Sequence, residues 1–129
     1  MRIAISATGP DLDAEVDPRF GRCRYFVVMD LETAEFEALD NSSAMGSGGV
    51  GISAAQMITG KGVEAVITGN CGPNAHQALS AAEIKVITGV RGNIRDAIED
   101  YKSGKFQVSS QPNVSTHSGI SPNKSMGLS

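Results

Sequence analysis

Long hydrophobic runs, lysine-rich blocks and closely spaced cysteine pairs are missing from this sequence of 129 residues. No stretch approaches the roughly 20 consecutive apolar residues that cross a bilayer, and the first residues look like a strand rather than a charged leader followed by an apolar segment. We therefore expect a cytoplasmic protein with no membrane partner. The formal net charge is −3 and aromatic residues make up 5% of the chain. Because the broad basic face of a nucleic-acid-binding protein is absent, we expect no nucleic acid partner.

The chain has two cysteines, Cys23 and Cys71, and neither belongs to a CxxC motif with a histidine pair at zinc spacing. A structural zinc site is therefore not expected. In a reducing cytoplasm both residues should be free thiols. Cys71 directly precedes Gly72-Pro73, where a helix is predicted to begin. Because a helix N-terminus stabilises a thiolate, Cys71 is the stronger candidate for a metal-binding thiol.

Apolar periodicity predicts one domain of alternating strands and helices over residues 1–106. The expected strands are residues 2–6, 25–30, 35–39, 64–68 and 84–88, and the expected helices are residues 50–59, 73–82 and 93–101. Right-handed crossovers would then give an α/β fold, with a five-stranded mixed sheet, an antiparallel hairpin strand and helices on both faces. Residues 107–129 are rich in serine and carry a single charged side chain, so we expect a flexible tail.

The second predicted helix has an apolar face formed by Ala75, Ala78, Leu79 and Ala82. This spacing predicts that the face packs on the sheet. His76 lies away from these positions, so we expect it at the surface, and a metal-binding role is the less favoured alternative.

A short motif occurs twice, as VITGNCG at residues 66–72 and as VITGVRG at residues 86–92. Each copy indicates a buried strand that runs into a glycine turn and then into a helix, and Thr8-Gly9 gives the first strand a similar ending. If the three strands are parallel, their turns share one edge of the sheet. The N–H groups and positive dipole ends of two helices would then open at that edge, which predicts an anion site.

Arginine is concentrated near the predicted turns. Six of the eleven basic residues are arginines, and five of them fall in two short stretches, Arg19, Arg22 and Arg24, then Arg91 and Arg95. Guanidinium groups present planar sets of donors that suit oxyanions. This distribution favours a local anion site within an acidic protein, although solvated surface arginines are the alternative for each one.

Two other segments resemble known ligand-binding motifs. The glycine loop GSGGVG at residues 46–51 matches GxGxxG, but the strand that follows ends in Thr68-Gly69 without the carboxylate of a dinucleotide site, and no Walker lysine is present. A close approach of some other ligand to this loop remains open, against the alternative of a surface loop. The segment DLDAEVD at residues 11–17 lacks the glycine and final glutamate of a calcium loop, so we expect it to be solvated.

Five segments together resemble the dinitrogenase iron-molybdenum cofactor biosynthesis family, which includes NifX and the C-terminal part of NifB. They are RIAISATG, DPRFGRCRYFVVMD, GSGGVGISAAQ, KGVEAVITGNCGPNAHQAL and AAEIKVITGV, within residues 1–105. The resemblance implies a ribonuclease H-like fold and binding or carriage of a molybdenum-containing metal-sulfur cluster, with no enzymatic turnover. The chain is also similar to the small stand-alone subgroup called orange protein, which holds a Mo-Cu sulfide cluster noncovalently. A Mo-Cu-S or Fe-Mo-S cluster is therefore the expected cofactor, and assembly proteins are expected partners.

The residues expected to hold the cluster are glycines, backbone donors, arginines and one apolar side chain near the predicted edge. They are Phe20, Gly21, Arg22, Gly48, Gly49, Gly51, Gly69, Asn70, Gly72, Asn74 and Arg91, with Cys71 and Cys23 as candidate metal ligands. The glycines would allow close approach, residues 69–72 and 89–92 would donate N–H groups, the arginines would offset negative charge, and Phe20 would line an apolar wall. Many relatives have no cysteine at these two positions, so metal ligation by a thiolate is left open.

Two other functions are considered beside cluster binding. A regulatory or scaffolding module would bind a nucleotide or a protein partner at the same edge. A nuclease with a ribonuclease H-like fold would hold divalent metal between carboxylates on the sheet. The first predicted strand contains no carboxylate, so nuclease activity is not favoured.

Overall fold

A computed structural model of the chain describes residues 1–41 and 50–106. Eight elements follow one another in this part of the chain: β1 (Arg2–Ala7), β2 (Tyr25–Asp30), β3 (Phe36–Asp40), α1 (Val50–Thr59), β4 (Ala65–Ile67), α2 (Pro73–Ala81), β5 (Lys85–Ile87) and α3 (Ile94–Lys102). The type and order of every predicted element are confirmed. The predicted tail and most of the predicted glycine loop, including Gly48 and Gly49, lie outside the described residues.

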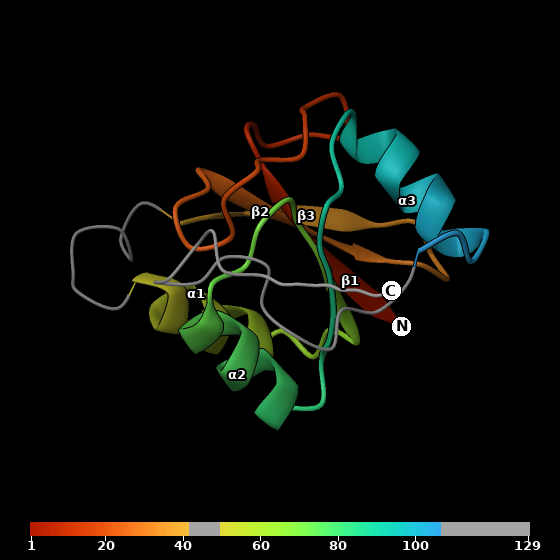
Figure 1. The fold of residues 1–129 in the computed structure, drawn as a ribbon. Helices are drawn as coiled ribbons and strands as arrows, with labels where there is room; N and C mark the ends of the chain where they lie inside the picture. The colour runs from red at the N-terminus through yellow and green to blue at the C-terminus, as the bar shows by residue number, and fades with distance from the viewer. Residues whose placement is uncertain (42–49, 107–129) are drawn as a thin grey trace, which may run out of the picture.

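The sheet has five strands in the order β3-β2-β1-β4-β5. Strand β1 pairs antiparallel with β2 and parallel with β4, β4 pairs parallel with β5, and β2 pairs antiparallel with β3 in a hairpin. The predicted α/β class with a mixed sheet is therefore confirmed (Figure 1). Five of the six β1 residues are buried, as is typical of a central strand that is covered on both faces.

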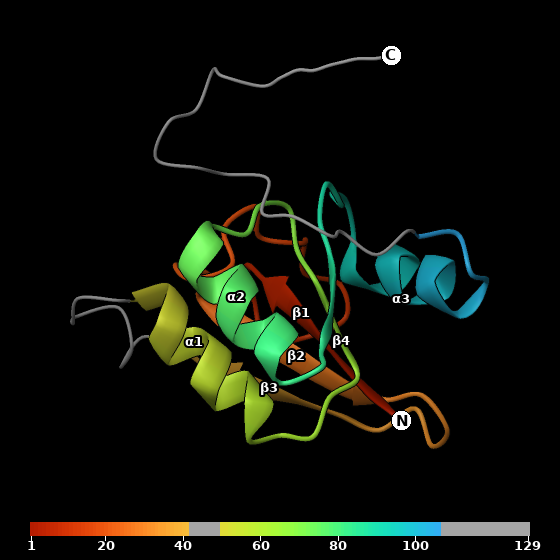
Figure 2. The same cartoon turned by 60° about the horizontal axis from the view of Figure 1, so that its bottom comes forward.

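Helices cover both faces of the sheet. Figures 1 and 2 show α1 and α2 on one face and α3 on the other. Successive side chains of a strand point to opposite faces, and β1 follows this rule: Ala4 packs in the cluster with α1 and α2, whereas Ile3 and Ile5 pack in the cluster with α3. None of the described helices has the length and apolar character needed to cross a membrane.

The buried face of α2 differs from the prediction. Ala75, His76 and Leu79 are its buried residues, whereas Ala82 is exposed beyond the end of the helix. The expectation that His76 lies at the surface is therefore wrong. The reason is that α2 packs against α1 as well as the sheet, so a wider arc of the helix is covered. A β-carbon on Gly51 would lie 3.3 Å from the β-carbon of Ala75, which shows how closely the two helices approach.

Candidate functional site

The turns that follow β1, β4 and β5 lie at one edge of the sheet, because the three strands are parallel neighbours. Two direct contacts join these turns. The hydroxyl oxygens of Ser6 and Thr68 are 2.7 Å apart, and the Gly89 N–H donates to the Gly69 carbonyl at 2.8 Å. The predicted common edge is confirmed, and we call it the carboxyl edge.

The arginine-bearing segment after β1 is attached to this edge by backbone contacts. The Phe20 N–H donates to the Asn70 carbonyl at 3.1 Å, and the Asn70 side-chain amide donates to the Pro18 carbonyl at 3.0 Å. Arg19 and Asn70 thereby form a parallel bridge. The segment at residues 18–24 consequently lies beside residues 70–72, which lead into α2 (Figures 1 and 2).

A shallow concavity of about 380 Å³ lies at this place, and its walls are Thr8, Asp17, Arg19, Arg22 and Arg24. The side chains of Arg22 and Arg24 are exposed. The Arg24 guanidinium lies 5.8 Å from the ring centre of Tyr25, and Arg22 makes no ion pair with any residue that the structure describes. Guanidinium groups therefore line the concavity and are open to an anionic ligand.

Asp17 contributes the single carboxylate of this lining. Its side chain is buried, and its Oδ1 atom accepts the Arg19 backbone N–H at 2.9 Å and lies 3.4 Å from Arg19 Nε. Arg19 thus offsets the charge of Asp17. With Arg22 and Arg24 in addition, the lining carries a net positive charge.

The N-terminus of α2 opens beside the arginine segment. Its N-cap residue is Gly72, no side chain of residues 1–41 and 50–106 caps the helix, and Pro73 occupies the first turn. A β-carbon on Gly72 would meet no heavy atom within 4 Å. Among the described residues none accepts a hydrogen bond from the N–H groups of Asn74 or Ala75. Within the described part of the chain, these donors and the positive end of the helix dipole consequently have no acceptor.

The N-terminus of α3, in contrast, is closed, so the prediction that two helices open at this edge is wrong. The Ile94 N–H donates to the Ala14 carbonyl at 2.9 Å, and the Arg95 N–H donates to the Asn93 side chain at 2.8 Å. Asn93 also donates through its side chain to the Asp13 carbonyl at 3.1 Å. The acidic loop at residues 11–17 therefore caps α3 and is not simply solvated.

The two arginines after β5 are separate from the concavity. Arg95 forms an ion pair of 3.1 Å with Asp13 of the capping loop. Arg91 is exposed on the turn after β5 and does not line the concavity. Of the two arginines predicted to hold the cluster, only Arg22 lines this concavity.

Phe20 and both cysteines lie beneath the surface of the site. Phe20 is 2% exposed, and its ring centre is 5.1 Å from that of Phe26, so it belongs to the core. The prediction that it lines an open apolar wall is therefore wrong. Cys23 donates through Sγ to the Phe20 carbonyl at 3.3 Å. Burial, with a smaller contribution from the Asp17 charge, raises the pKa of Cys23 to about 12.

Cys71 is also buried, and burial raises its pKa to about 11. The expected stabilisation of a thiolate at the start of α2 is therefore wrong, because loss of hydration disfavours the charged form of this buried thiol. No group of three or more His, Cys, Asp or Glu side chains is placed to hold a metal ion within residues 1–41 and 50–106.

Sequence reasoning missed one supporting residue, Asn41. Its buried side-chain amide donates to the carbonyls of Gly21 and Cys23 at 3.1 and 3.0 Å. These bonds hold the backbone on both sides of Arg22. An asparagine two residues after a predicted strand carries no distinctive signal in the sequence, since its partners lie far away along the chain. Arg19 and Arg24 lie close to Arg22 in the sequence, but only Arg22 was predicted to hold the cluster, whereas all three line the concavity.

Comparisons with known proteins agree with this architecture. A family model described as "Dinitrogenase iron-molybdenum cofactor" matches residues 1–104. The chain belongs to the dinitrogenase iron-molybdenum cofactor family, as its sequence motifs indicated. It is similar to the apo form of the orange protein (ORP) from Desulfovibrio gigas, with 43% sequence identity, a TM-score of 0.85 and coverage of 88% of this chain and 96% of that chain.

Two further relatives have lower identity. A NifB-type protein from Thermotoga has 32% identity and a TM-score of 0.70, with 83% of this chain and 91% of that chain covered. An uncharacterized protein from Methanocaldococcus jannaschii is 31% identical over 110 residues, which cover 83% of this chain and 90% of that protein. Family and neighbours together point to handling of an iron-molybdenum-type cofactor.

Proposed function

We propose that this protein noncovalently binds and carries a molybdenum-containing metal-sulfur cluster, of the Mo-Cu or Fe-Mo type, during cofactor assembly or metal handling. The observation that carries the proposal is the uncapped N-terminus of α2 beside a concavity lined by Arg19, Arg22 and Arg24. The cluster is the cargo of the protein, and no chemical turnover is proposed.

The residues present fit such a cargo. Thiomolybdate-type clusters are bulky polyanions, which require hydrogen-bond donors and positive charge rather than a deep apolar cavity. The N–H groups of Asn74 and Ala75 supply donors at a helix N-terminus, and the space around Gly72 is open, since even a β-carbon there would meet no heavy atom within 4 Å. Arg22 and Arg24 supply charge.

The two thiols support a noncovalent mode of binding. Metal ligation requires a thiolate, and burial raises the pKa values of Cys23 and Cys71 to about 12 and about 11. Both side chains are therefore neutral in the free protein, and both are buried beneath the surface of the site. The donors that remain are amides and guanidinium groups, which hold sulfide surfaces by hydrogen bonds and charge.

A ribonuclease H-like topology is part of this proposal, and the strand order β3-β2-β1-β4-β5 with an antiparallel β2 supports it. Nuclease chemistry receives no support from the part of the chain that the structure describes. Strand β1 carries no carboxylate, and no cluster of acidic side chains suited to a metal ion occurs among those residues.

Anaerobic reconstitution tests the proposed function. Purified full-length chain is mixed with thiomolybdate and either cuprous or ferrous ion, desalted, and examined by visible absorption and by elemental analysis for molybdenum, copper and iron. We expect a new visible band and molybdenum retained in a fixed ratio to protein with one of the two metals. Loss of all molybdenum on desalting in both mixtures would contradict the proposal. If the protein stays colourless and a nucleotide copurifies with it, the result would instead favour a regulatory module.

A further inference from the structure

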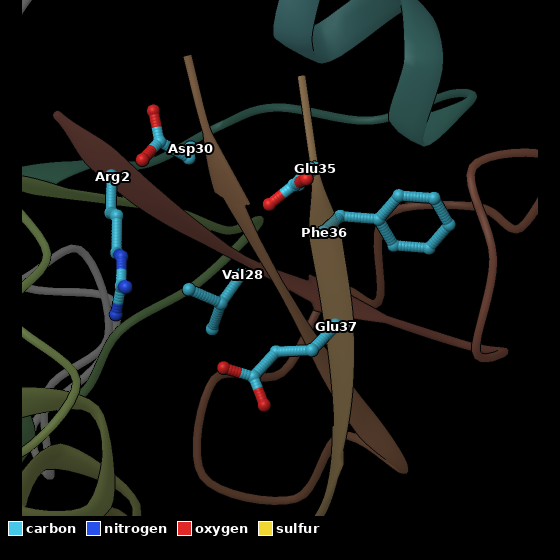
Figure 3. Close-up of a pocket in the computed structure, with 6 residues that line it drawn as sticks. All are labelled: Arg2, Val28, Asp30, Glu35, Phe36 and Glu37. Carbon is cyan, nitrogen blue, oxygen red and sulfur yellow. The ribbon is translucent and has the colours of Figure 1, made fainter. Parts of the chain in front are cut away.

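We propose that β3 is a docking edge for an extended basic segment of a partner protein. The docking edge consists of the outward backbone groups of Phe36 and Ala38, the Phe36 ring, and an adjoining cavity of about 190 Å³. That cavity is lined by Arg2, Val28, Asp30, Glu35, Phe36 and Glu37 (Figure 3).

The pairing of β3 with β2 determines where its backbone groups point. The Asp30 N–H donates to the Glu35 carbonyl at 2.9 Å, and the Asn41 N–H donates to the Arg24 carbonyl at 3.0 Å. Hydrogen-bonded pairs alternate with non-hydrogen-bonded pairs along an antiparallel ladder.

Phe36 is opposite Met29 and Ala38 is opposite Val27, which are the non-hydrogen-bonded positions of this ladder. The N–H and C=O groups of Phe36 and Ala38 therefore point away from β2. Because β3 is the last strand of the sheet that the described residues form, these groups are available to pair with an additional strand.

The two faces of β3 offer different side chains. Phe36 points away from the side on which Val28 and Glu37 lie (Figure 3). Its ring is 42% exposed and lies outside the apolar cluster beneath α3. An added strand would thus meet an uncovered aromatic ring on one face and the cavity on the other.

The cavity has an acidic character. Three of its lining residues, Asp30, Glu35 and Glu37, carry carboxylates, and Arg2 is the positively charged residue of the lining. Lys61, outside the lining, pairs with Glu37 at 3.6 Å, so the excess of negative charge lies at Asp30 and Glu35. The Glu32 backbone N–H bonds to Asp30 at 2.9 Å and lowers the pKa of its carboxyl group, so this group stays ionised. A lysine or arginine side chain fits such a lining, because its charged end can meet the carboxylates.

Charge also distinguishes a partner segment from a second copy of this chain. Two β3 strands placed side by side would bring the carboxylates of Glu35 and Glu37 from both copies together, and such like-charge pairs oppose association. A segment with alternating basic and apolar side chains has no such conflict. Its basic side chains would face the cavity while its apolar side chains covered Phe36.

Fluorescence anisotropy with labelled peptides and the full chain tests this inference. The probes are one short peptide of alternating lysine and valine and one of alternating glutamate and valine. We expect saturable binding of the basic peptide only. Equal binding of both peptides, or binding of neither, would overturn the proposal.

Variants at one position separate strand pairing from simple charge attraction. Ala38→Pro removes an outward N–H while leaving the bonds to β2 in place, and Ala38→Val retains the N–H at the same position. We expect the proline variant to bind the basic peptide at least about tenfold more weakly and the valine variant to bind as the parent does. Circular dichroism melting checks that both variants are folded, and equal binding by two folded variants would refute strand pairing.

Two further measurements test the role of the carboxylates and the possibility that the chain binds a second copy of itself. Glu35→Gln combined with Glu37→Gln should weaken binding, whereas Glu99→Gln on α3, where Glu99 pairs with Lys102 at 3.7 Å, should not. Sedimentation of the free chain should show no dimer that forms through the docking edge. A dimer that the Ala38→Pro substitution dissociates would show that a second copy occupies β3 and would contradict our assignment.

Discussion

A β-carbon on Gly69 would lie 2.7 Å from the Cα atom of Pro18, so these two residues bring their backbones into direct contact. The contact allows the Phe20 N–H to reach the Asn70 carbonyl at 3.1 Å. Through this pair of segments the arginines after β1 are held beside the N-terminus of α2. The position of the candidate site therefore depends on the absence of a side chain at residue 69.

Replacing Gly69 with alanine should destabilise the protein, because the obstacle is backbone and cannot rotate away. We expect the free energy of unfolding to fall by about 1 to 3 kcal/mol, measured by urea denaturation. Gly72→Ala is the matched control, since a β-carbon there meets nothing within 4 Å and the φ angle is −73°. Equal stability of the two variants would show that the Pro18 segment moves aside at little cost.

Arg22→Ala should weaken cluster uptake more than Arg91→Ala, because Arg22 lines the concavity and Arg91 does not. We expect about a tenfold loss of affinity for Arg22→Ala from the removal of one charge-assisted contact. Molybdenum retained after desalting at several thiomolybdate concentrations is the measurement. Lys85→Ala is the charge-matched control, since Lys85 is exposed at the start of β5, away from the carboxyl edge. If Arg22→Ala behaves as Lys85→Ala does, the concavity is not where the cluster binds.

The variant with Cys23→Ala and Cys71→Ala should take up the cluster as the parent does, because both thiols are neutral and buried. Visible absorption and metal content per protein are the readouts. The spectrum distinguishes an intact cluster from loosely bound metal. A folded double variant that loses its visible band would show that a thiolate joins the metal after all.

Stability should decrease as the pH rises above about 9. The pKa values of Cys23 and Cys71 are raised from 9.0 to about 12 and about 11 in the folded state, so the unfolded chain loses these protons first and is favoured at alkaline pH. The contribution of the neutral thiols is complete below pH 9 and is lost between pH 9 and about 12.

Urea denaturation between pH 8 and pH 11 measures this dependence, with a slope of at most about 1.4 kcal/mol per pH unit for each thiol. The double alanine variant at Cys23 and Cys71 should show a shallower slope. Burial also raises the pKa of Tyr101, which donates to Glu64 at 2.6 Å, so Tyr101→Phe is a separate comparison. Identical slopes for the parent and the double alanine variant would contradict the account.

The fold was predictable because its signals are local. Strand and helix periods, the glycine turns and the proline at the start of α2 all lie within a few residues of the structure that they determine. The buried face of α3 has the same local basis, since Ile94, Ala97 and Ile98 recur at helical spacing and are buried. The face of α2 lacks this basis, because burial of His76 depends on packing that involves α1 as well as the sheet.

The candidate site was only partly predictable. The repeated turn motif led correctly to a common edge, since parallel neighbours must end together. The carbonyls of Leu12 and Ala14 accept the first N–H groups of α3. The sequence could not predict these bonds, because Leu12 and Ala14 lie far from Ile94 along the chain. The burial of Phe20 and Cys71 was not predictable either. Each residue lies next to a glycine, and that position in the sequence does not show whether the side chain is buried.

By itself, the sequence determined the element order, the α/β class, the family and the presence of an arginine-rich carboxyl edge, because these depend on short-range patterns and on strand direction. Only the tertiary structure decided which helix N-terminus stays open and which arginines line the concavity. It also decided that both thiols are buried, which raises their pKa values. The physical reason is that hydrogen-bond partners and loss of hydration are set by segments that meet only when the chain folds.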